Sequence, residues 1–416
     1  MGLKISKSKL IGFSGLLLLG LMMIFISQLY VIKIFLMLIL LILVKKKPAK
    51  ISLYVKIAYT LIFTYGIYGI FFGLLYQTPN PFLFTTIYCI YPLFFLLITT
   101  FLDKESYFKN ILKVIFFSHF FILSYDLLYA WAVFSGIEIP NIYFLENAFT
   151  FHESGSRMNF VNLNTLTFST PVLFLILIGD YKLGIPKWIQ LIIMAFTFFL
   201  LIISGRRSVM LVIFSLPFLP LIFSSFFSKK IKHNIIKSSI VFALGFIITF
   251  TIVNTNYPKF IEDYTNIFLK AFDSDVEPIK FVQKKMLIEK FMENPIFGHG
   301  AGAMFYEPSP GRAVFANQFE LSYHFKLAST GIVGFFLIIG VYLWVFFYGL
   351  YLAKKNNDLL FFSLLIGLFF MLIADATNPV LTSFDLIWPL YLCLAKINYW
   401  RTAPLFSNRI KISHYN

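Results

Sequence analysis

The run FKLASTGIVGFFLIIGVYLWVFFYGLYL, residues 325–352, decides the fold class of this protein. It contains no charged residue from Leu327 to Leu352, and about 20 consecutive apolar residues are enough for a helix to cross a bilayer. Similar apolar runs recur along the whole chain, which is 59% hydrophobic and only 13% charged. Soluble domains have about 25% charged residues. The sequence therefore predicts an all-α polytopic membrane protein that forms one integral membrane domain over residues 1–416.

The apolar runs predict about twelve transmembrane helices. They lie at residues 10–26, 29–44, 54–76, 81–102, 111–134, 161–179, 188–203, 208–227, 238–254, 325–352, 359–374 and 383–399. When these helices alternate in direction, the lysine-rich connections all fall on the same side as both termini. The positive-inside rule assigns that side to the cytoplasm. The same anchoring explains the net charge of +16, and no basic patch interleaved with aromatic residues argues for nucleic-acid binding.

Two substantial segments, residues 135–160 and 255–324, are expected on the outer side. The second forms a large extracytoplasmic loop between the ninth and tenth helices. It contains most of the longest polar interval of the chain, which runs from Glu277 to Gly334. We therefore expect this loop to carry the chemistry, while the apolar runs hold it at a membrane face.

The arginines have an unusual distribution. The chain has only six, namely Arg157, Arg206, Arg207, Arg312, Arg401 and Arg409. The first four fall on the outer side, against the usual bias. The planar guanidinium group binds phosphate oxygens through two hydrogen bonds. These four arginines are therefore candidates for binding an anionic ligand, with contact to lipid headgroups as the alternative.

The polar interval begins with an expected helix over residues 279–293. Its polar side carries Lys280 and Gln283, and Pro278 stands where a helix can begin. The glycine-rich run at residues 298–302 is a backbone that can offer N–H donors to an anion. Asp273 and Asp275 have the spacing of a metal-binding pair, but capping of the helix explains them, so no metal is expected.

Glu320 and His324 are four residues apart and share a face at the start of the tenth helix. An ionisable side chain at this position is costly unless it is paired or used. Either group can remove a proton from an attacking hydroxyl. The alternative is that Glu320 pairs with Lys326 or Arg312 and that His324 packs as an interfacial ring.

Other polar residues lie inside or at the ends of the expected helices. They are His119, Asp126, Asn164, Asp375 and Asn378. Polar side chains within a membrane usually face the bundle interior. Hydrogen bonds between helices are a sufficient explanation for each of them.

Several of these segments together resemble the motifs of the O-antigen ligase and polymerase superfamily. Ser204-Gly205-Arg206-Arg207-Ser208 resembles its SGSR-type motif, and residues 294–300, NPIFGHG, resemble its NPLFGxG motif. Residues 319–323, which lead into TGIVG at residues 330–334, resemble its final block. Arg157 with Asn164, and Asn378 with Pro379, resemble two further family patterns. The order and spacing of the motifs cover most of the chain from about residue 150 onward.

The resemblance implies a membrane glycosyltransferase with the polytopic C-type fold, working without metal or cofactor. Its substrate would be an undecaprenyl-pyrophosphate-linked oligosaccharide at the periplasmic face of the bacterial inner membrane. Glu320 or His324 would act as the base. Arg157, Arg206, Arg207, Lys280, Gln283 and Arg312 would bind the pyrophosphate or the sugar. Besides membrane lipids, the resemblance implies a chain-length regulator protein as a partner.

Two departures from the family pattern guide the choice between its branches. Ligases commonly have a His-Asn pair at the position of Glu320, so the repeat-unit polymerase is favoured and transfer of glycan to lipid A core is the alternative. Lys280 stands where the family often has arginine, and it can neutralise phosphate as a point charge. A transporter or flippase is a further alternative, but the polar residues are concentrated in one outer segment and no related halves are evident.

Overall fold

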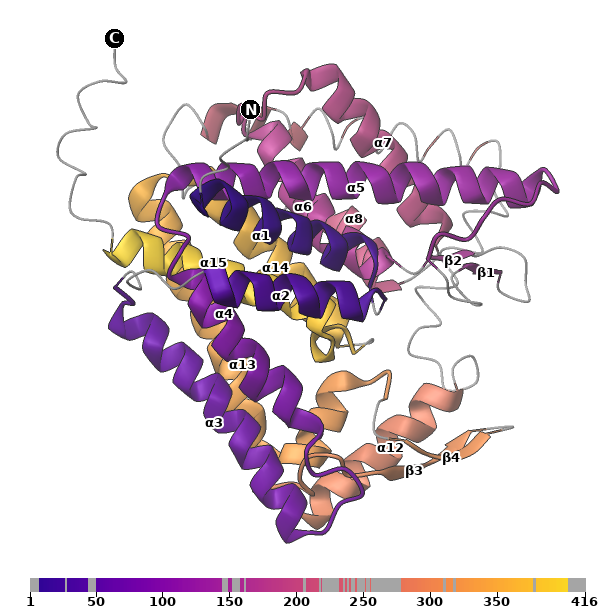
Figure 1. The fold of residues 1–416 in the computed structure, drawn as a ribbon. Helices are drawn as coiled ribbons and strands as arrows, with labels where there is room; N and C mark the ends of the chain where they lie inside the picture. Colours follow the sequence, from indigo (N-terminus) through magenta and orange to yellow (C-terminus); the bar gives the residue numbers. More distant parts are fainter. Residues whose placement is uncertain are drawn as a thin grey trace.

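The computed structural model describes residues 7–26, 28–43, 50–143, 149–151, 158–160, 162–204, 207–216, 218, 278–309, 312–316, 319–376 and 379–402, and a few positions between 232 and 255. Half of the eighth expected helix, residues 208–227, and most of the ninth, residues 238–254, lie outside this part of the chain, as do residues 256–277 of the expected outer loop. Figure 1 shows the described part as a bundle of helices with two short two-stranded antiparallel sheets.

The helices follow the predicted apolar runs closely. In the N-terminal part they are α1 (Lys7–Ile24), α2 (Tyr30–Leu43), α3 (Leu53–Leu75), the π-helix η1 (Thr85–Ile90), α4 (Tyr91–Thr99), α5 (Glu105–Phe134), α6 (Leu163–Ile178), α7 (Lys187–Ile203) and α8 (Arg207–Ser215). In the C-terminal part they are α12 (Pro278–Glu293), α13 (Ser322–Asn356), α14 (Leu359–Asp375), the 3-10 helix η4 (Val380–Thr382) and α15 (Phe384–Thr402). The strands are β1 (Phe149–Phe151), β2 (Met158–Phe160), β3 (Phe305–Ser309) and β4 (Arg312–Ala316).

Three helices are long and apolar enough to cross a membrane by length and composition, among the residues that the structure describes. They are α3, residues 105–132 of α5, and α13. Several of the other helices are apolar but shorter. The structure is therefore that expected of an all-α membrane protein. The count of twelve spans and the loop at residues 255–324 stay predictions.

The fourth expected span is irregular. Instead of one helix over residues 81–102, η1 precedes α4, and Pro92 lies in the first turn of α4. The glycines of α3 explain how η1 approaches so closely. A Cβ atom at Gly69 would lie 2.3 Å from the ring of Phe84, and one at Gly66 would lie 2.7 Å from Cys89 Sγ. This close packing places the end of α3 beside the candidate site.

The centre of the bundle is formed by α6 and α14, which pack against each other along their length. Nearly all of their residues are buried, as expected for helices that are hydrophobic on every side. His119 of α5 joins this core by hydrogen bonds to Ser169 Oγ of α6 (2.7 Å) and Thr197 Oγ1 of α7 (2.8 Å). The prediction that His119 bonds between helices is confirmed.

Buried ion pairs tie the last helix to its neighbours. Lys396 of α15 lies 3.0 Å from Asp358 at the start of α14 and 2.5 Å from Glu105 at the start of α5. At the opposite end of α15, Asp385 pairs with Lys33 of α2 at 2.7 Å. Except at Glu105, whose side chain is 36% exposed, these opposite charges satisfy each other where the surrounding helices exclude water.

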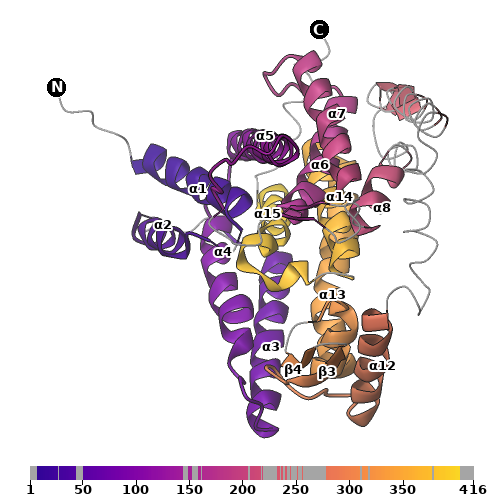
Figure 2. The same cartoon turned by 90° about the vertical axis from the view of Figure 1, so that its right-hand side faces the viewer.

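The polar C-terminal elements gather at one end of the molecule. Figure 2 shows α12, β3 and β4 beside the C-terminal end of α3 and the first turns of α13. In the structure α12 contacts both α13 and β3. This end holds five of the residues that the sequence nominates for the chemistry, namely Lys280, Gln283, Arg312, Glu320 and His324.

Candidate active site

The first feature of the site is a break in α13. Gly331 has φ 61° and ψ −173°, a conformation outside the helical region that essentially only glycine adopts. A Cβ atom there would also lie 2.3 Å from the carbonyl oxygen of Ile296. The TGIVG motif therefore encodes an interruption of the helix, which a loop from elsewhere in the chain fills.

That loop is the NPIFGHG segment, residues 294–300. His299 and Gly300 donate their backbone N–H groups to the carbonyls of Ala328 (3.2 Å) and Ser329 (2.7 Å). Beyond the break, Ile332 N–H donates to the carbonyl of Pro295 at 2.9 Å. These bonds satisfy the backbone groups that the interrupted helix leaves open, as a membrane environment requires. Two motifs that lie apart in the sequence thus form one unit.

The end of α3 completes this unit, which we call the joint (residues 294–302, Gly331, and residues 68–78 at and after the end of α3). Ala301 N–H donates to the carbonyl of Gly69 at 2.8 Å, and Thr78 Oγ1 donates to the carbonyl of Ala301 at 2.6 Å. The Tyr68 hydroxyl lies 2.9 Å from the carbonyl of Phe297 and 3.1 Å from that of Thr330. The joint therefore fixes α3, the loop and α13 to one another.

The joint corrects one expectation from the sequence. The glycine-rich run was expected to offer N–H donors to an anion. The N–H groups of residues 298–301 instead donate to the carbonyls of Asn294, Ala328, Ser329 and Gly69. His299 Nε2 also bonds to a carbonyl, that of Lys290, at 2.8 Å. These N–H groups are engaged in hydrogen bonds within the protein. The glycines allow the loop to approach α3 and α13 closely.

Replacing Gly331 by alanine is expected to destabilise the joint. The forced conformation costs about 1–3 kcal/mol, and the new Cβ atom meets the Ile296 carbonyl. We expect a lower thermal unfolding midpoint of the detergent-solubilised protein. The matched control is Gly340→Ala in the same helix, because a Cβ atom at Gly340 meets nothing within 4 Å. Equal midpoints for the two variants would contradict the role of the break.

Beside the joint, α12 carries Lys280 and Gln283, which the structure places on different sides of the helix. The expectation that both lie on its polar side holds for Lys280 and is wrong for Gln283, which is 4% exposed. The helix begins at Pro278 and ends at Glu293, as the sequence predicts. Its inner face buries Gln283 and Leu287 against β3 and α13. On its outer side, Lys280 Nζ lies 3.2 Å from Glu320 Oε2, with the side chains 31% and 56% exposed. Lys280, the expected phosphate-binding cation, and Glu320, the expected base, therefore form an ion pair.

His324 lies in the first turn of α13. Its side chain is half-buried, and Nδ1 has no hydrogen-bond partner among the described residues. The charge of Lys284 on α12 is close enough to act on the imidazole. The structure brings together Lys280, Glu320 and His324 around the first turn of α13.

The structure describes the predicted arginines only in part. Arg207 begins α8 and Arg312 begins β4, and only their backbone positions are described. Arg157 and Arg206 lie outside the described residues, as do Asn378 and the pair Asp273 and Asp275. Among the residues that the structure describes, no group of three or more His, Cys, Asp or Glu side chains is arranged to hold a metal ion.

The structure reveals a buried ion pair beneath the site that differs from the expected pairing. The alternative reading of the sequence paired Glu320 with Lys326 or Arg312, but the Lys326 ammonium bonds to Asp375 Oδ2 at the end of α14. Lys326 Nζ also bonds to Ser322 Oγ at 2.7 Å, and Asp375 Oδ1 accepts from Leu381 N–H at 2.9 Å. The Lys326 and Asp375 side chains are 6% and 0% exposed. The sequence marks Asp375 as a carboxylate within an apolar run, but nothing in the pattern identifies Lys326 as its partner.

This pair borders a small cavity of about 40 Å³. The cavity is lined by Tyr65, Tyr88, Phe319, Phe325, Ser322 and Lys326, among others. Because charges are stable in such a setting only when every oxygen and proton is satisfied, the pair fixes the first turn of α13 relative to α14. It thereby holds Glu320 and His324 at the edge of the bundle.

Comparison with known proteins adds no family name. No protein-family model matches the chain. No curated protein matches it at a significant level of similarity.

Proposed function

We propose that this protein is a membrane glycosyltransferase that polymerises lipid-linked oligosaccharide repeat units. The donor is a growing glycan on undecaprenyl pyrophosphate, and the acceptor is the terminal sugar of another lipid-linked unit. One contact carries the proposal: Lys280 Nζ and Glu320 Oε2, from residues that the sequence nominates separately, lie 3.2 Å apart. A cation for phosphate next to a carboxylate base is the pair that such a transfer needs.

The transfer is a single displacement at the anomeric carbon. The acceptor hydroxyl oxygen forms the new glycosidic bond while the bond from the anomeric carbon to the pyrophosphate oxygen breaks. Glu320 takes the hydroxyl proton, and the lipid pyrophosphate leaves with the bonding electron pair. One displacement inverts the configuration at the anomeric carbon. No nucleotide sugar enters the reaction because the pyrophosphate ester is already activated.

Lys280 has to exchange partners in this mechanism. In the free protein its ammonium is held by Glu320, and the Lys280 and Glu320 side chains are 31% and 56% exposed. Exposed ion pairs contribute only about 0–1 kcal/mol, so a pyrophosphate can displace Glu320 at little cost. The displaced carboxylate then becomes available as a base while Lys280 stabilises the leaving group. Arg157, Arg206, Arg207 and Arg312 are proposed as further pyrophosphate-binding residues, and Gln283 as a substrate-binding one.

His324 is the second candidate for the base. Its Nδ1 has no hydrogen-bond partner among the described residues, so it can accept a proton from a hydroxyl. Glu320 is preferred because it is more exposed and because its partner, Lys280, is the group that the leaving pyrophosphate would attract. The two candidates predict different active variants, as argued in the Discussion.

Deleting the gene separates the polymerase from the ligase alternative. Loss of a polymerase is expected to leave single repeat units on the lipid A core, because capping of the core does not require polymerisation. Loss of a ligase leaves a core without any repeat unit. The two cases are distinguished by electrophoresis of surface glycolipids from the deletion strain. The complemented strain is the control. A bare core would contradict the polymerase assignment.

A further inference from the structure

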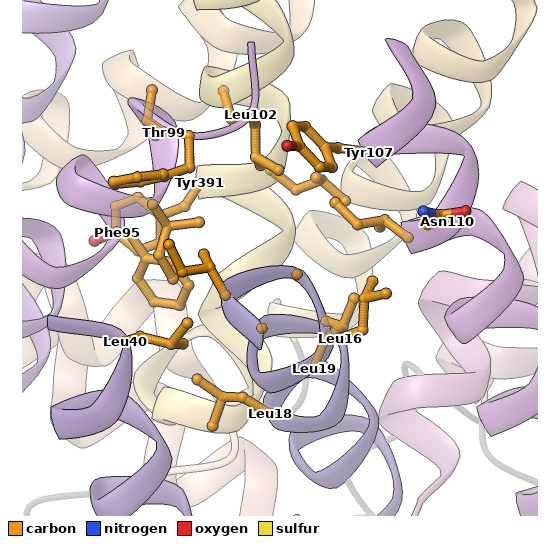
Figure 3. A pocket seen from close by; sticks show the side chains of 18 of the residues that line it. Leu16, Leu18, Leu19, Leu40, Phe95, Thr99, Leu102, Tyr107, Asn110 and Tyr391 are labelled. Carbon is orange, nitrogen blue, oxygen red and sulfur yellow. The ribbon is translucent and has the colours of Figure 1, made fainter. Parts of the chain in front are cut away.

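A large cavity lies between α1, α4, α5 and α15, away from the candidate active site. Its volume is about 740 Å³, within the range of about 300–1,000 Å³ typical of sites for small ligands. Figure 3 shows Leu18, Leu19 and Leu40 along one side of it and Phe95 and Tyr391 along another. None of Lys280, Gln283, Glu320 and His324 lines this cavity.

The interior of the cavity is suited to hydrocarbon. Its walls are mainly leucine, isoleucine and aromatic side chains. Gly12 and Gly15 of α1 also line it, and a Cβ atom added at either glycine would meet nothing within 4 Å. Apolar cavities stay free of water, and an empty space forfeits the dispersion contacts of its walls. Within a bundle of apolar helices, the chain of a membrane lipid is the material that fills such a space.

The mouth of the cavity is polar. It lies where α4 ends and α5 begins, and it carries Asp103, Lys104, Tyr107 and Asn110. In Figure 3, Tyr107 and Asn110 stand on the side opposite Leu40. None of the four side chains makes a hydrogen bond or an ion pair to a residue that the structure describes. The adjacent Glu105, by contrast, is paired with Lys396. The mouth thus presents one carboxylate and one ammonium side by side, ready for an external partner.

We propose that this cavity binds one phospholipid whose headgroup carries both a phosphate and a primary amine, as in phosphatidylethanolamine. An acyl chain lies along α1, α4 and α15. Lys104 binds the phosphate, and Asp103 accepts hydrogen bonds from the headgroup ammonium. Tyr107 and Asn110 donate to the phosphate or ester oxygens. An anionic headgroup without an amine fits less well, because it brings its charge towards Asp103 and leaves that carboxylate unpaired.

The test is a competition between two lipids. The full-length protein is reconstituted in nanodiscs that contain equal amounts of phosphatidylethanolamine and phosphatidylglycerol. It is then extracted in mild detergent, and retained lipid is identified by native mass spectrometry. We expect one retained phosphatidylethanolamine per protein. Retention of no lipid, or of phosphatidylglycerol in preference, would overturn the proposal.

Two variants locate the bound lipid. Gly15→Trp fills the cavity and is expected to lose the retained lipid. The control Gly340→Trp is expected to keep it, because Gly340 has similar open space but does not line the cavity. Asp103→Lys, at an exposed position where folding is not at risk, is expected to shift the preference to phosphatidylglycerol. Unchanged lipid identity in Asp103→Lys, or retention by a folded Gly15→Trp, would contradict the assigned site.

Discussion

Replacing Glu320 by glutamine is expected to lower the rate of polymer formation by about 10²–10⁴-fold, the usual contribution of a general base. Glutamine keeps the size of the side chain but cannot accept the hydroxyl proton. The variant also loses the attraction to Lys280. That pair is exposed, so the loss has little effect on folding. The measurement is the initial rate of polymer formation by equal amounts of purified, reconstituted protein.

Glu293→Gln is the matched control for this experiment. Glu293 is an exposed carboxylate at the end of α12, 51% exposed against 56% for Glu320, and it is likewise held by a lysine, Lys290. We expect this variant to keep the wild-type rate. An active Glu320→Gln together with an inactive His324→Gln would transfer the role of base to His324. Wild-type rates in both variants would show that neither Glu320 nor His324 is the base.

Breaking the buried pair of Lys326 and Asp375 is expected to have the largest effect on stability. Asp375→Asn leaves the Lys326 ammonium without its counterion in a buried position. An uncompensated buried charge costs about 3–5 kcal/mol. Lys326→Met is expected to be similarly harmful, because among the described residues it leaves the Asp375 carboxylate with Ser322 and the Leu381 N–H as its remaining partners. Both variants should show a much lower thermal unfolding midpoint in detergent.

The double variant Lys326→Met with Asp375→Leu separates the charge effect from simple loss of contacts. Removing both charges together is often neutral or even stabilising, so the double variant should unfold at a higher temperature than either single variant. Lys290→Met provides the control, since the exposed pair of Lys290 and Glu293 is worth little. Single variants as stable as this control would show that the buried pair does not hold α13 to α14.

The helices could be predicted because each apolar run carries its own signal. The expected spans 188–203 and 359–374 agree with α7 and α14 to within a residue or two. The irregular elements could not be predicted, because their causes lie elsewhere in the chain. The break at Gly331 depends on a loop near residue 296, and η1 depends on the glycine face of α3. The hydropathy of a run of residues carries no information about either of these contacts.

For the candidate site, the sequence nominated residues but could not give their contacts. The motifs nominated Lys280, Glu320 and His324, and the structure places them around one helix start. Which cation meets which carboxylate depends on helix packing. Lys326 points into the bundle towards α14, while Lys280 on α12 reaches Glu320. The sequence pattern of the glycine loop was equally consistent with anion binding and with close packing, and only the hydrogen bonds of its N–H groups distinguish the two.

The central claim is that this chain alone joins lipid-linked repeat units. Purified protein is reconstituted in liposomes with undecaprenyl-pyrophosphate-linked repeat units as the only glycan, without nucleotide sugar, and the products are resolved by electrophoresis. We predict a ladder of polymers from wild-type protein and its absence with Glu320→Gln. Repeat units that remain monomeric with folded wild-type protein, or that only cross the bilayer, would contradict the account.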